Sequence, residues 1–133
     1  MTKFVEEGKR LDEPRRILLV DDDDVYLHTM ADWLRSYGYE VSEAKDGVEA
    51  LRLMPEVQPD LVMADFLMPN MDGLALLKAI RESDVRLPVF LVTGHDDRLA
   101  EIALVSNSVT VVAPKTIDLN ILKSHIEKLT RRW

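Results

Sequence analysis

The sequence contains no cysteine, which excludes disulfide bonds, thiolate metal sites and cysteine nucleophiles. Basic residues are in deficit, with 17 Lys and Arg against 24 Asp and Glu and a formal net charge of −7. This balance argues against a nucleic-acid-binding domain, which would need a basic face. No apolar run approaches the ~18 residues that span a bilayer, and the first residues lack the apolar core of a signal peptide. We therefore expect a cytoplasmic protein without membrane or nucleic-acid contacts.

The composition is nevertheless sufficient for one domain with a hydrophobic core. The 133 residues are 47% hydrophobic, and a chain of this size buries about two-thirds of its unfolded surface. Residues 1–15 are mostly charged and are expected to form a flexible arm rather than an added element. The domain is expected to span residues 16–133.

From residue 17 onward, strand-like and helical patterns of apolar residues alternate. Strands are expected at residues 17–20, 39–44, 61–64, 89–92 and 109–113. Helical spacing is found in residues 27–34, 46–54, 74–80, 96–105 and 119–129. Gly38 is expected to end the first helix, while Asp46 begins and Pro55 ends the second.

This alternation predicts an α/β fold with five strand–helix units, (βα)5. Strands that alternate with helices pair in parallel through right-handed crossovers. Strands that are apolar on both faces need helices on both sides of the sheet. We therefore expect a doubly wound parallel sheet, whose functional residues lie just beyond the carboxyl ends of the strands.

Acidic residues follow two of these strands. Asp21 and Asp22 come directly after the first strand, and Asp65 follows the third. Carboxylates that share one crevice repel each other and favour a bound cation, and oxygen-only ligands suit Mg²⁺ better than softer metals. Asp21, Asp22 and Asp65 are therefore candidate metal ligands. Asp23 and Asp24 are interpreted as opening the first helix, with Asp24 as its cap.

Asp65 is also a candidate nucleophile. A carboxylate beside a metal at the end of a central strand can attack phosphorus and form an aspartyl phosphate. Thr93 and Lys115 follow the fourth and fifth strands, where a hydroxyl and an ammonium group can contact phosphoryl oxygens. Gly94 leaves space for such a group. A phosphohydrolase would need a second acid two residues after the nucleophile, where Leu67 stands, so this alternative ranks far behind.

A resemblance to a known family rests on ILLVDDD, PDLVMADFLMPNMDGLALLKAIR, LPVFLVTG and the late Lys115. These segments resemble the receiver domain of two-component response regulators, in particular chemotaxis-type single-domain receivers. The resemblance implies a flavodoxin-like fold with strand order 2-1-3-4-5. It implies that Asp65 accepts a phosphoryl group from a sensor histidine kinase or a histidine phosphotransfer protein. Mg²⁺ would be held by Asp21 through water and by Asp22, Asp65 and the backbone carbonyl of Leu67, while Thr93 and Lys115 contact the phosphoryl group.

The same resemblance implies a signalling role rather than an ordinary enzyme. Such a domain catalyses only its own phosphorylation and dephosphorylation. Output is expected through contact with a downstream protein partner, and homodimer formation on activation is compatible with it.

Three departures from the family pattern lie near the fifth strand. The family lysine normally precedes a cis-proline, but here Pro114 comes before Lys115 and Thr116 follows. Val112 occupies the position of an aromatic switch residue, and Ser108-Val109 replaces a pair of small residues. We expect a trans Lys115–Thr116 bond and an edge position for Pro114. These departures support the alternative of a degenerate receiver, a phosphorylation-independent interaction module.

Three aromatic residues, Tyr26, Trp33 and Tyr37, follow one another at steps of seven and four in the first helix. They lie along one flank of that helix, where a partner surface is one interpretation. Packing at the helix edge is the interpretation that we favour.

Overall fold

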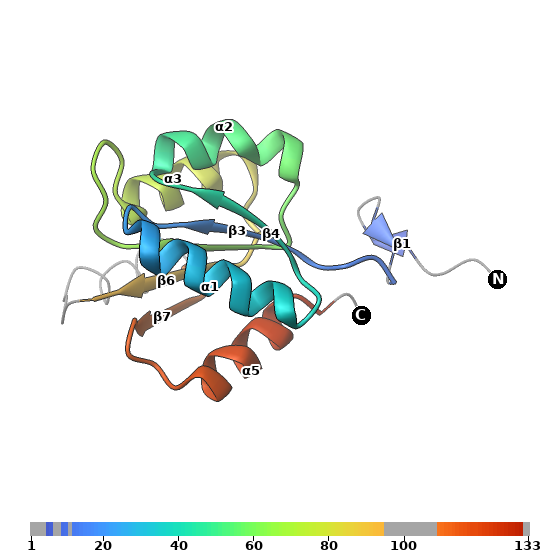
Figure 1. Cartoon of the computed structure of the whole chain (residues 1–133). Coiled ribbons are helices and arrows are strands. Elements are labelled where there is room, and N and C mark those ends of the chain that lie inside the picture. The colour runs from blue at the N-terminus through green and yellow to red at the C-terminus, as the bar shows by residue number, and fades with distance from the viewer. Residues whose placement is uncertain (1–4, 7–8, 11, 95–108, 132–133) are drawn as a thin grey trace.

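The structure is a computed structural model that describes residues 5–6, 9–10, 12–94 and 109–131. Five strands form one sheet (Figure 1): β3 (Arg16–Val20), β4 (Glu40–Ala44), β5 (Leu61–Asp65), β6 (Val89–Thr93) and β7 (Val111–Pro114). Their order is β4-β3-β5-β6-β7, and all neighbours pair in parallel. Numbered along the chain, these strands follow the order 2-1-3-4-5. The predicted flavodoxin-like parallel sheet is therefore confirmed in the described part of the chain.

Helices cover both faces of the sheet. The described helices are α1 (Asp24–Ser36), α2 (Gly47–Val57), α3 (Gly73–Ser83) and α5 (Leu119–Leu129). Helices α2 and α3 lie on one side of the sheet, and α1 and α5 lie on the other (Figure 1). The helix expected at residues 96–105 lies outside the described residues. None of the described helices is both long and apolar enough to cross a membrane.

Residues of the central strands alternate between two hydrophobic clusters because successive strand side chains point to opposite faces. In β3, Leu18 and Val20 join the cluster beneath α2 and α3. Ile17 and Leu19 join the cluster beneath α1 and α5. All four side chains are almost fully buried. Both faces of the sheet are thus core faces, as the apolar runs predicted.

Aspartates begin all four described helices. The side chains of Asp23, Asp46, Asp72 and Asp118 each accept hydrogen bonds from backbone N–H groups of the first turn. The cap of α1 is Asp23, and Asp24 is the first helical residue, so the prediction of Asp24 as the cap was wrong. The reason is geometric: Asp23 has an extended backbone, and its carboxylate reaches the N–H groups of Val25 and Tyr26.

The helix ends follow the sequence signals less closely. Gly38 adopts a φ of +91° directly after the C-cap of α1, as expected for a helix stop. Pro55, in contrast, does not end α2, which continues to Val57. Proline removes its own N–H donor and crowds the carbonyl four residues earlier, but it leaves the N–H groups that follow it in place. The later N–H of Gln58 still reaches the Met54 carbonyl at 2.9 Å, so the last turn is retained.

The arm contains a small element that the sequence analysis did not predict. Strands β1 (Val5–Glu6) and β2 (Lys9–Arg10) form an antiparallel pair separate from the main sheet. Strands of two residues are too short to show a hydrophobic period, which explains why the pattern did not predict them. The flexibility of residues 1–15 stays a prediction.

Strand β7 is an edge strand, as the position of Pro114 requires. The Lys115 N–H donates to the Thr93 carbonyl at 2.8 Å, so the nitrogen of the preceding Pro114 faces the open edge. None of the described peptide bonds is cis, which confirms the trans Lys115–Thr116 bond. Val112 is half-buried and packs against the cluster beneath α2 and α3.

Candidate functional site

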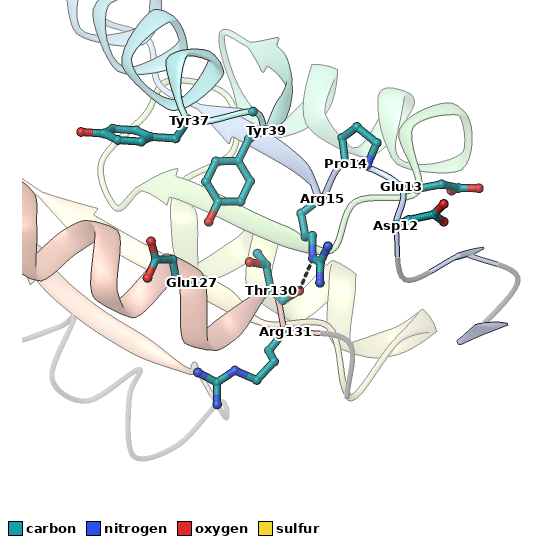
Figure 2. A pocket seen from close by; sticks show the side chains of 10 residues that line it. Asp12, Glu13, Pro14, Arg15, Tyr37, Tyr39, Glu127, Thr130 and Arg131 are labelled. Atoms are coloured by element: carbon teal, nitrogen blue, oxygen red, sulfur yellow. Dashed lines mark hydrogen bonds between the residues drawn. The ribbon is translucent and has the colours of Figure 1, made fainter. Parts of the chain in front are cut away.

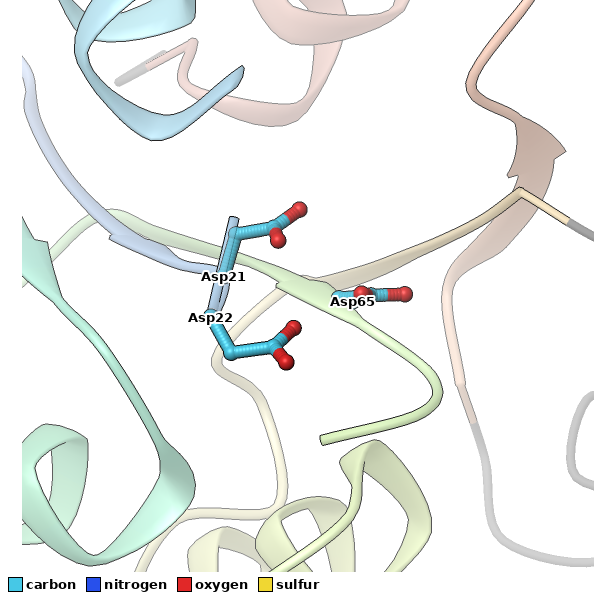
Figure 3. Close-up of side chains that lie close together, drawn as sticks. All are labelled: Asp21, Asp22 and Asp65. Carbon is cyan, nitrogen blue, oxygen red and sulfur yellow. The ribbon is translucent and has the colours of Figure 1, made fainter. Parts of the chain in front are cut away.

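Three carboxylates meet at the carboxyl ends of two neighbouring strands. Asp21 and Asp22 follow β3, and Asp65 ends β5. Because Val20 pairs with Ala64, the residues that come next in each strand lie at the same edge. One oxygen from each carboxylate lies within 4.8 Å of the other two (Figure 3). Asp21 is 1% exposed and Asp65 is 8% exposed, whereas Asp22 is exposed to solvent. The predicted convergence of these acids is confirmed.

The buried carboxylate of Asp21 has a specific partner on each oxygen. Its Oδ1 accepts the backbone N–H of Asp23 at 2.8 Å. Its Oδ2 lies 2.8 Å from Nζ of Lys115. The backbone N–H of Asp21 in turn donates to the Ala44 carbonyl of β4 at 3.1 Å. These bonds fix the orientation of the Asp21 carboxylate within the cluster.

Lys115 connects the two buried carboxylates. Besides its contact with Asp21, its Nζ lies 3.4 Å from Oδ2 of Asp65. The Pro-Lys-Thr order therefore does not remove the lysine from the acidic cluster, because the backbone bond to Thr93 sets its position at the end of β7. The cluster contains three carboxylates and one ammonium group, so it keeps an excess of negative charge.

Burial and charge shift the pKa values in this cluster. Burial, followed by the negative charge of Asp21, raises the pKa of Asp65, although Lys115 and the Leu67 N–H partly oppose the shift. Burial by itself would lower the pKa of Lys115, but the two carboxylates outweigh it, and the pKa of Lys115 is raised. The raised pKa favours the protonated ammonium of Lys115, while ionisation of Asp65 is less favourable than that of an ordinary aspartate. A metal cation bound beside the Lys115 ammonium would reduce the repulsion among the three carboxylates.

The donor set fits a hard divalent cation. All three side chains offer only carboxylate oxygens, which Mg²⁺ prefers. Leu67, the fourth ligand implied by the sequence resemblance, lies in the loop just after β5. Its N–H donates to Oδ1 of Asp65 at 3.4 Å. The role of its carbonyl as a ligand stays a prediction.

The loop after Asp65 is tied to the start of α2. Asn70 has a φ of +67°, a conformation that Asn tolerates better than most residues. Its Nδ2 donates to Oδ2 of Asp46, the cap of α2, at 3.2 Å. This hydrogen bond and that of the Glu49 N–H, the larger cause, lower the pKa of Asp46. Sequence reasoning missed this contact, for which an Asn in a turn-rich segment was the only signal.

Thr93 lies where the sequence analysis predicted it, at the end of β6. It is 7% exposed, and its strand neighbour Val92 pairs with Asp65 of β5. Thr93 therefore lies at the same sheet edge as the carboxylates. The next residue, Gly94, is exposed, and among the described residues a Cβ added there would meet only the Lys115 side chain, at 3.8 Å. The expected space beside Thr93 is present in the described part of the chain.

Tyr26 is a member of this site that sequence reasoning missed. The Lys115 Nζ lies 4.4 Å from the centre of the Tyr26 ring. Burial, followed among the raising causes by Asp21 and Asp65, raises the pKa of Tyr26 to about 12, although Lys115 opposes the shift. The packing interpretation of the flank is correct for Tyr26 and Trp33, which pack against the cluster beneath α1. The spacing of Tyr26 four residues after Asp22 was an available signal for its place near the acids.

A separate pocket lies at the opposite end of the sheet (Figure 2). It has a volume of about 510 Å³, and its walls are formed by the end of the arm, the start of β4 and the end of α5. Within it, Nε of Arg15 donates to the Thr130 carbonyl at 3.2 Å. It is lined by Asp12, Glu13, Pro14, Arg15, Tyr37, Gly38, Tyr39, Glu127, Thr130 and Arg131. Its position at the amino ends of the strands separates it from the carboxylate cluster.

Curated proteins similar to this chain are bacterial regulators. The response regulator MprA of Mycobacterium sp. (strain KMS) is 35% identical over 119 residues, covering 90% of this chain and 52% of MprA. The transcriptional regulatory protein TrcR of Mycobacterium tuberculosis is 32% identical over 119 residues, covering 90% of this chain and 46% of TrcR. The chain thus spans about half the length of these relatives.

Solved structures similar to this chain are also response regulators. A putative response regulator from Chloroflexus aurantiacus is 31% identical with a TM-score of 0.81, covering 90% of this chain and 99% of that one. The response regulator TrrA from Thermotoga maritima, in complex with Mg(2+)-BeF, is 30% identical with a TM-score of 0.78, covering 86% and 98%. A family model described as the response regulator receiver domain matches residues 17–127, which contain the carboxylate cluster and Lys115. The chain therefore belongs to the response regulator receiver domain family.

Proposed function

We propose that this receiver domain accepts a phosphoryl group on Asp65 from the phosphohistidine of a sensor histidine kinase or a histidine phosphotransfer protein. The observation that supports this most directly is the arrangement of charge around Asp65. Two further carboxylates lie beside it, and the Lys115 ammonium bridges Asp65 and Asp21. This arrangement provides a nucleophile, acidic ligands for a cation and a fixed positive charge.

In the proposed step, a lone pair of the Asp65 carboxylate attacks phosphorus. A phosphorus–oxygen bond forms while the phosphorus–nitrogen bond of the donor breaks, and the donor imidazole takes up a proton from solvent. The attack requires ionised Asp65, which the Lys115 charge and the Leu67 N–H both favour. Asp21 opposes ionisation, so the reaction depends on neutralising the cluster.

The cation that suits this cluster is Mg²⁺, which would be held by Asp22 and Asp65, by Asp21 through water, and by the Leu67 carbonyl. When bound, it would offset charge on the carboxylates and on the transferring phosphoryl group. The Lys115 ammonium would pair with one phosphoryl oxygen, and the Thr93 hydroxyl would donate to another. TrrA, a relative with the same fold, was solved in complex with Mg(2+)-BeF.

Output is proposed to occur through contact with a downstream protein, with homodimer formation as one route, in the cytoplasm as the sequence predicts. The domain would act on itself alone, in phosphorylation and dephosphorylation. The degenerate-receiver alternative depends on the altered residues around Lys115. Lys115 nevertheless keeps its ammonium group 2.8 Å from Asp21, so the described residues at this site do not favour that alternative.

Incubation with acetyl phosphate and Mg²⁺, followed by intact mass measurement, tests the proposal. We expect the wild type to gain the mass of one phosphoryl group and Asp65→Asn to gain none. Asp72→Asn is the matched control, because Asp72 belongs to the same loop and Asn also caps helices. It should be phosphorylated like the wild type. A wild-type protein that stays unmodified would instead support the interaction module.

A further inference from the structure

The aromatic ring of Tyr26 lies against the ammonium group that the proposed chemistry needs. Tyr26 is the third residue of α1, and Lys115 follows β7, so the contact joins two segments that are distant in the sequence. The Lys115 Nζ lies 4.4 Å from the ring centre, 2.8 Å from Asp21 and 3.4 Å from Asp65. The ammonium group is therefore enclosed by one ring and two carboxylates.

We propose that Tyr26 is a positioning residue, whose ring holds the Lys115 ammonium beside Asp65 so that it meets the arriving phosphoryl group. This inference rests on the proposed function, since it assigns a role within the same site. Tyr26 acts through Lys115 and does not itself contact the reacting atoms.

The chemical difference between a ring and a carboxylate explains why a ring suits this task. The face of an aromatic ring attracts an ammonium group through its quadrupole but carries no net charge. A further carboxylate would hold the lysine equally well and would repel the incoming phosphoryl group. The ring thus restrains Lys115 without adding to the negative charge that already surrounds Asp65.

The lysine side chain needs such a restraint because it is long and flexible. Its backbone is fixed by the bond from Lys115 N–H to the Thr93 carbonyl, but several rotatable bonds separate this anchor from Nζ. When the phosphoryl group draws the ammonium away from Asp65, the Tyr26 ring remains as a contact that does not compete for the phosphoryl oxygen. The Lys115 ammonium then stays beside the carboxylate cluster.

A second tyrosine–lysine contact in the same molecule provides a control. Tyr37, the C-cap of α1, has Nζ of Lys123 over its ring at 4.1 Å from the centre. Eleven residues separate the two tyrosines, about three helical turns, so both rings lie on one side of the helix. Tyr37 is 49% exposed and caps the carboxyl end of α1, whereas the carboxylate cluster lies at the amino end of that helix, where Asp21 accepts a hydrogen bond from the Asp23 N–H.

The first experiment compares phosphorylation rates with acetyl phosphate and Mg²⁺. Replacing the ring in Tyr26→Leu or Tyr26→Met should slow phosphorylation about three- to tenfold, the range expected for loss of a partly desolvated cation–π contact. Tyr26→Phe keeps the ring face and should restore the wild-type rate. Tyr37→Leu should also react like the wild type. Equal rates for wild type, Tyr26→Leu and Tyr26→Met would overturn the role of Tyr26 and leave the proposed function intact.

A second experiment asks whether Tyr26 acts through Lys115. In a Lys115→Ala background, Tyr26→Leu should cause no further loss of rate, because the group that it positions is already gone. An undiminished effect in that background would overturn the proposal. The NMR signals of the Lys115 ε-methylene protons should carry a ring-current shift in the wild type and in Tyr26→Phe, and lose it in Tyr26→Leu. A shifted signal in a wild type that is never phosphorylated would show the contact but overturn its assigned role together with the proposed function.

Discussion

Gly73 lies directly against the backbone of Asp65. A Cβ at position 73 would stand 2.7 Å from the Asp65 carbonyl oxygen and 2.9 Å from Cα of Phe66. The Gly73 N–H also donates to the Phe66 carbonyl at 2.8 Å. The start of α3 and the end of β5 are thus in contact at a distance that only glycine allows, and this contact holds the backbone of Asp65, the proposed phosphoacceptor, against α3.

Replacing Gly73 by Ala should therefore destabilise the fold by about 1–3 kcal/mol, the usual cost of overpacking. The clash is with backbone, which cannot move aside like a flexible side chain. Urea unfolding measures the change. Gly94→Ala is the control, because its added Cβ would make only an ordinary contact of 3.8 Å. Equal stability of the two variants would contradict the close approach.

Replacing Asp23 by Ala should cost about 1 kcal/mol, because its side chain caps α1 through two backbone N–H groups. Asp24→Ala should cost less, since Asp24 offers only a favourable charge in the first turn and a 4.0 Å exposed contact to Lys45. Thermal unfolding of both variants checks the order. If Asp24→Ala is the more destabilised, Asp24 rather than Asp23 is the cap.

Stability without divalent cations should depend on the protonation of Asp65. Burial, and then Asp21, raise its folded pKa above the unfolded value, so between these two pKa values the folded protein keeps a proton that the unfolded chain has lost. The stabilising contribution is complete below the ordinary Asp pKa of about 3.9 and is lost as the pH rises through the raised value. In EDTA, Asp65→Asn should thus be more stable than the wild type at pH 7, and the difference should shrink below pH ~4. A wild type more stable than Asp65→Asn at pH 7 would mean that the Lys115 pair dominates.

Mg²⁺ should stabilise the folded protein by binding the carboxylate cluster. At a concentration ten times the dissociation constant, linkage predicts about 1.4 kcal/mol. Asp22→Ala should lose most of this stabilisation because Asp22 is a proposed direct ligand. Asp24→Ala, which removes an acid outside the cluster, should retain it. Thermal unfolding with and without Mg²⁺ checks both, and the reverse pattern would show that the acids are assigned in the wrong register.

The phosphorylated state should be long-lived for a receiver domain. Leu67, two residues after Asp65, is 47% exposed and offers no hydrogen bond to orient an attacking water. Leu67→Asn should therefore speed loss of the phosphoryl group, measured by intact mass after removal of the phosphodonor. If the phosphoryl group is lost at the same rate or more slowly, Leu67 does not limit attack by water. We expect the attacking water to reach Asp65 between Leu67 and His95, and His95 lies outside the described residues.

The order of the elements and the identity of the acids could be predicted because each depends on local sequence. Apolar runs such as Ile17 to Val20 predict buried strands whatever their partners. Asp21, Asp22 and Asp65 follow such runs directly, so the rule that parallel strands end at one edge was sufficient to bring them together. The family resemblance added the strand order and the roles of Thr93 and Lys115.

Other features depended on the exact backbone geometry or on contacts between distant segments. The continuation of α2 past Pro55 depends on a carbonyl that the N–H of Gln58 can still reach, and the choice of Asp23 over Asp24 as cap depends on backbone angles. The Tyr26–Lys115 contact joins residues that are far apart in the sequence, and no periodicity carries such information. The local sequence pattern thus determined which residues form strands and helices and which acids follow the strands. Only the tertiary structure decided that the Tyr26 ring contacts Lys115, because this contact depends on how α1 and the end of β7 pack together in space.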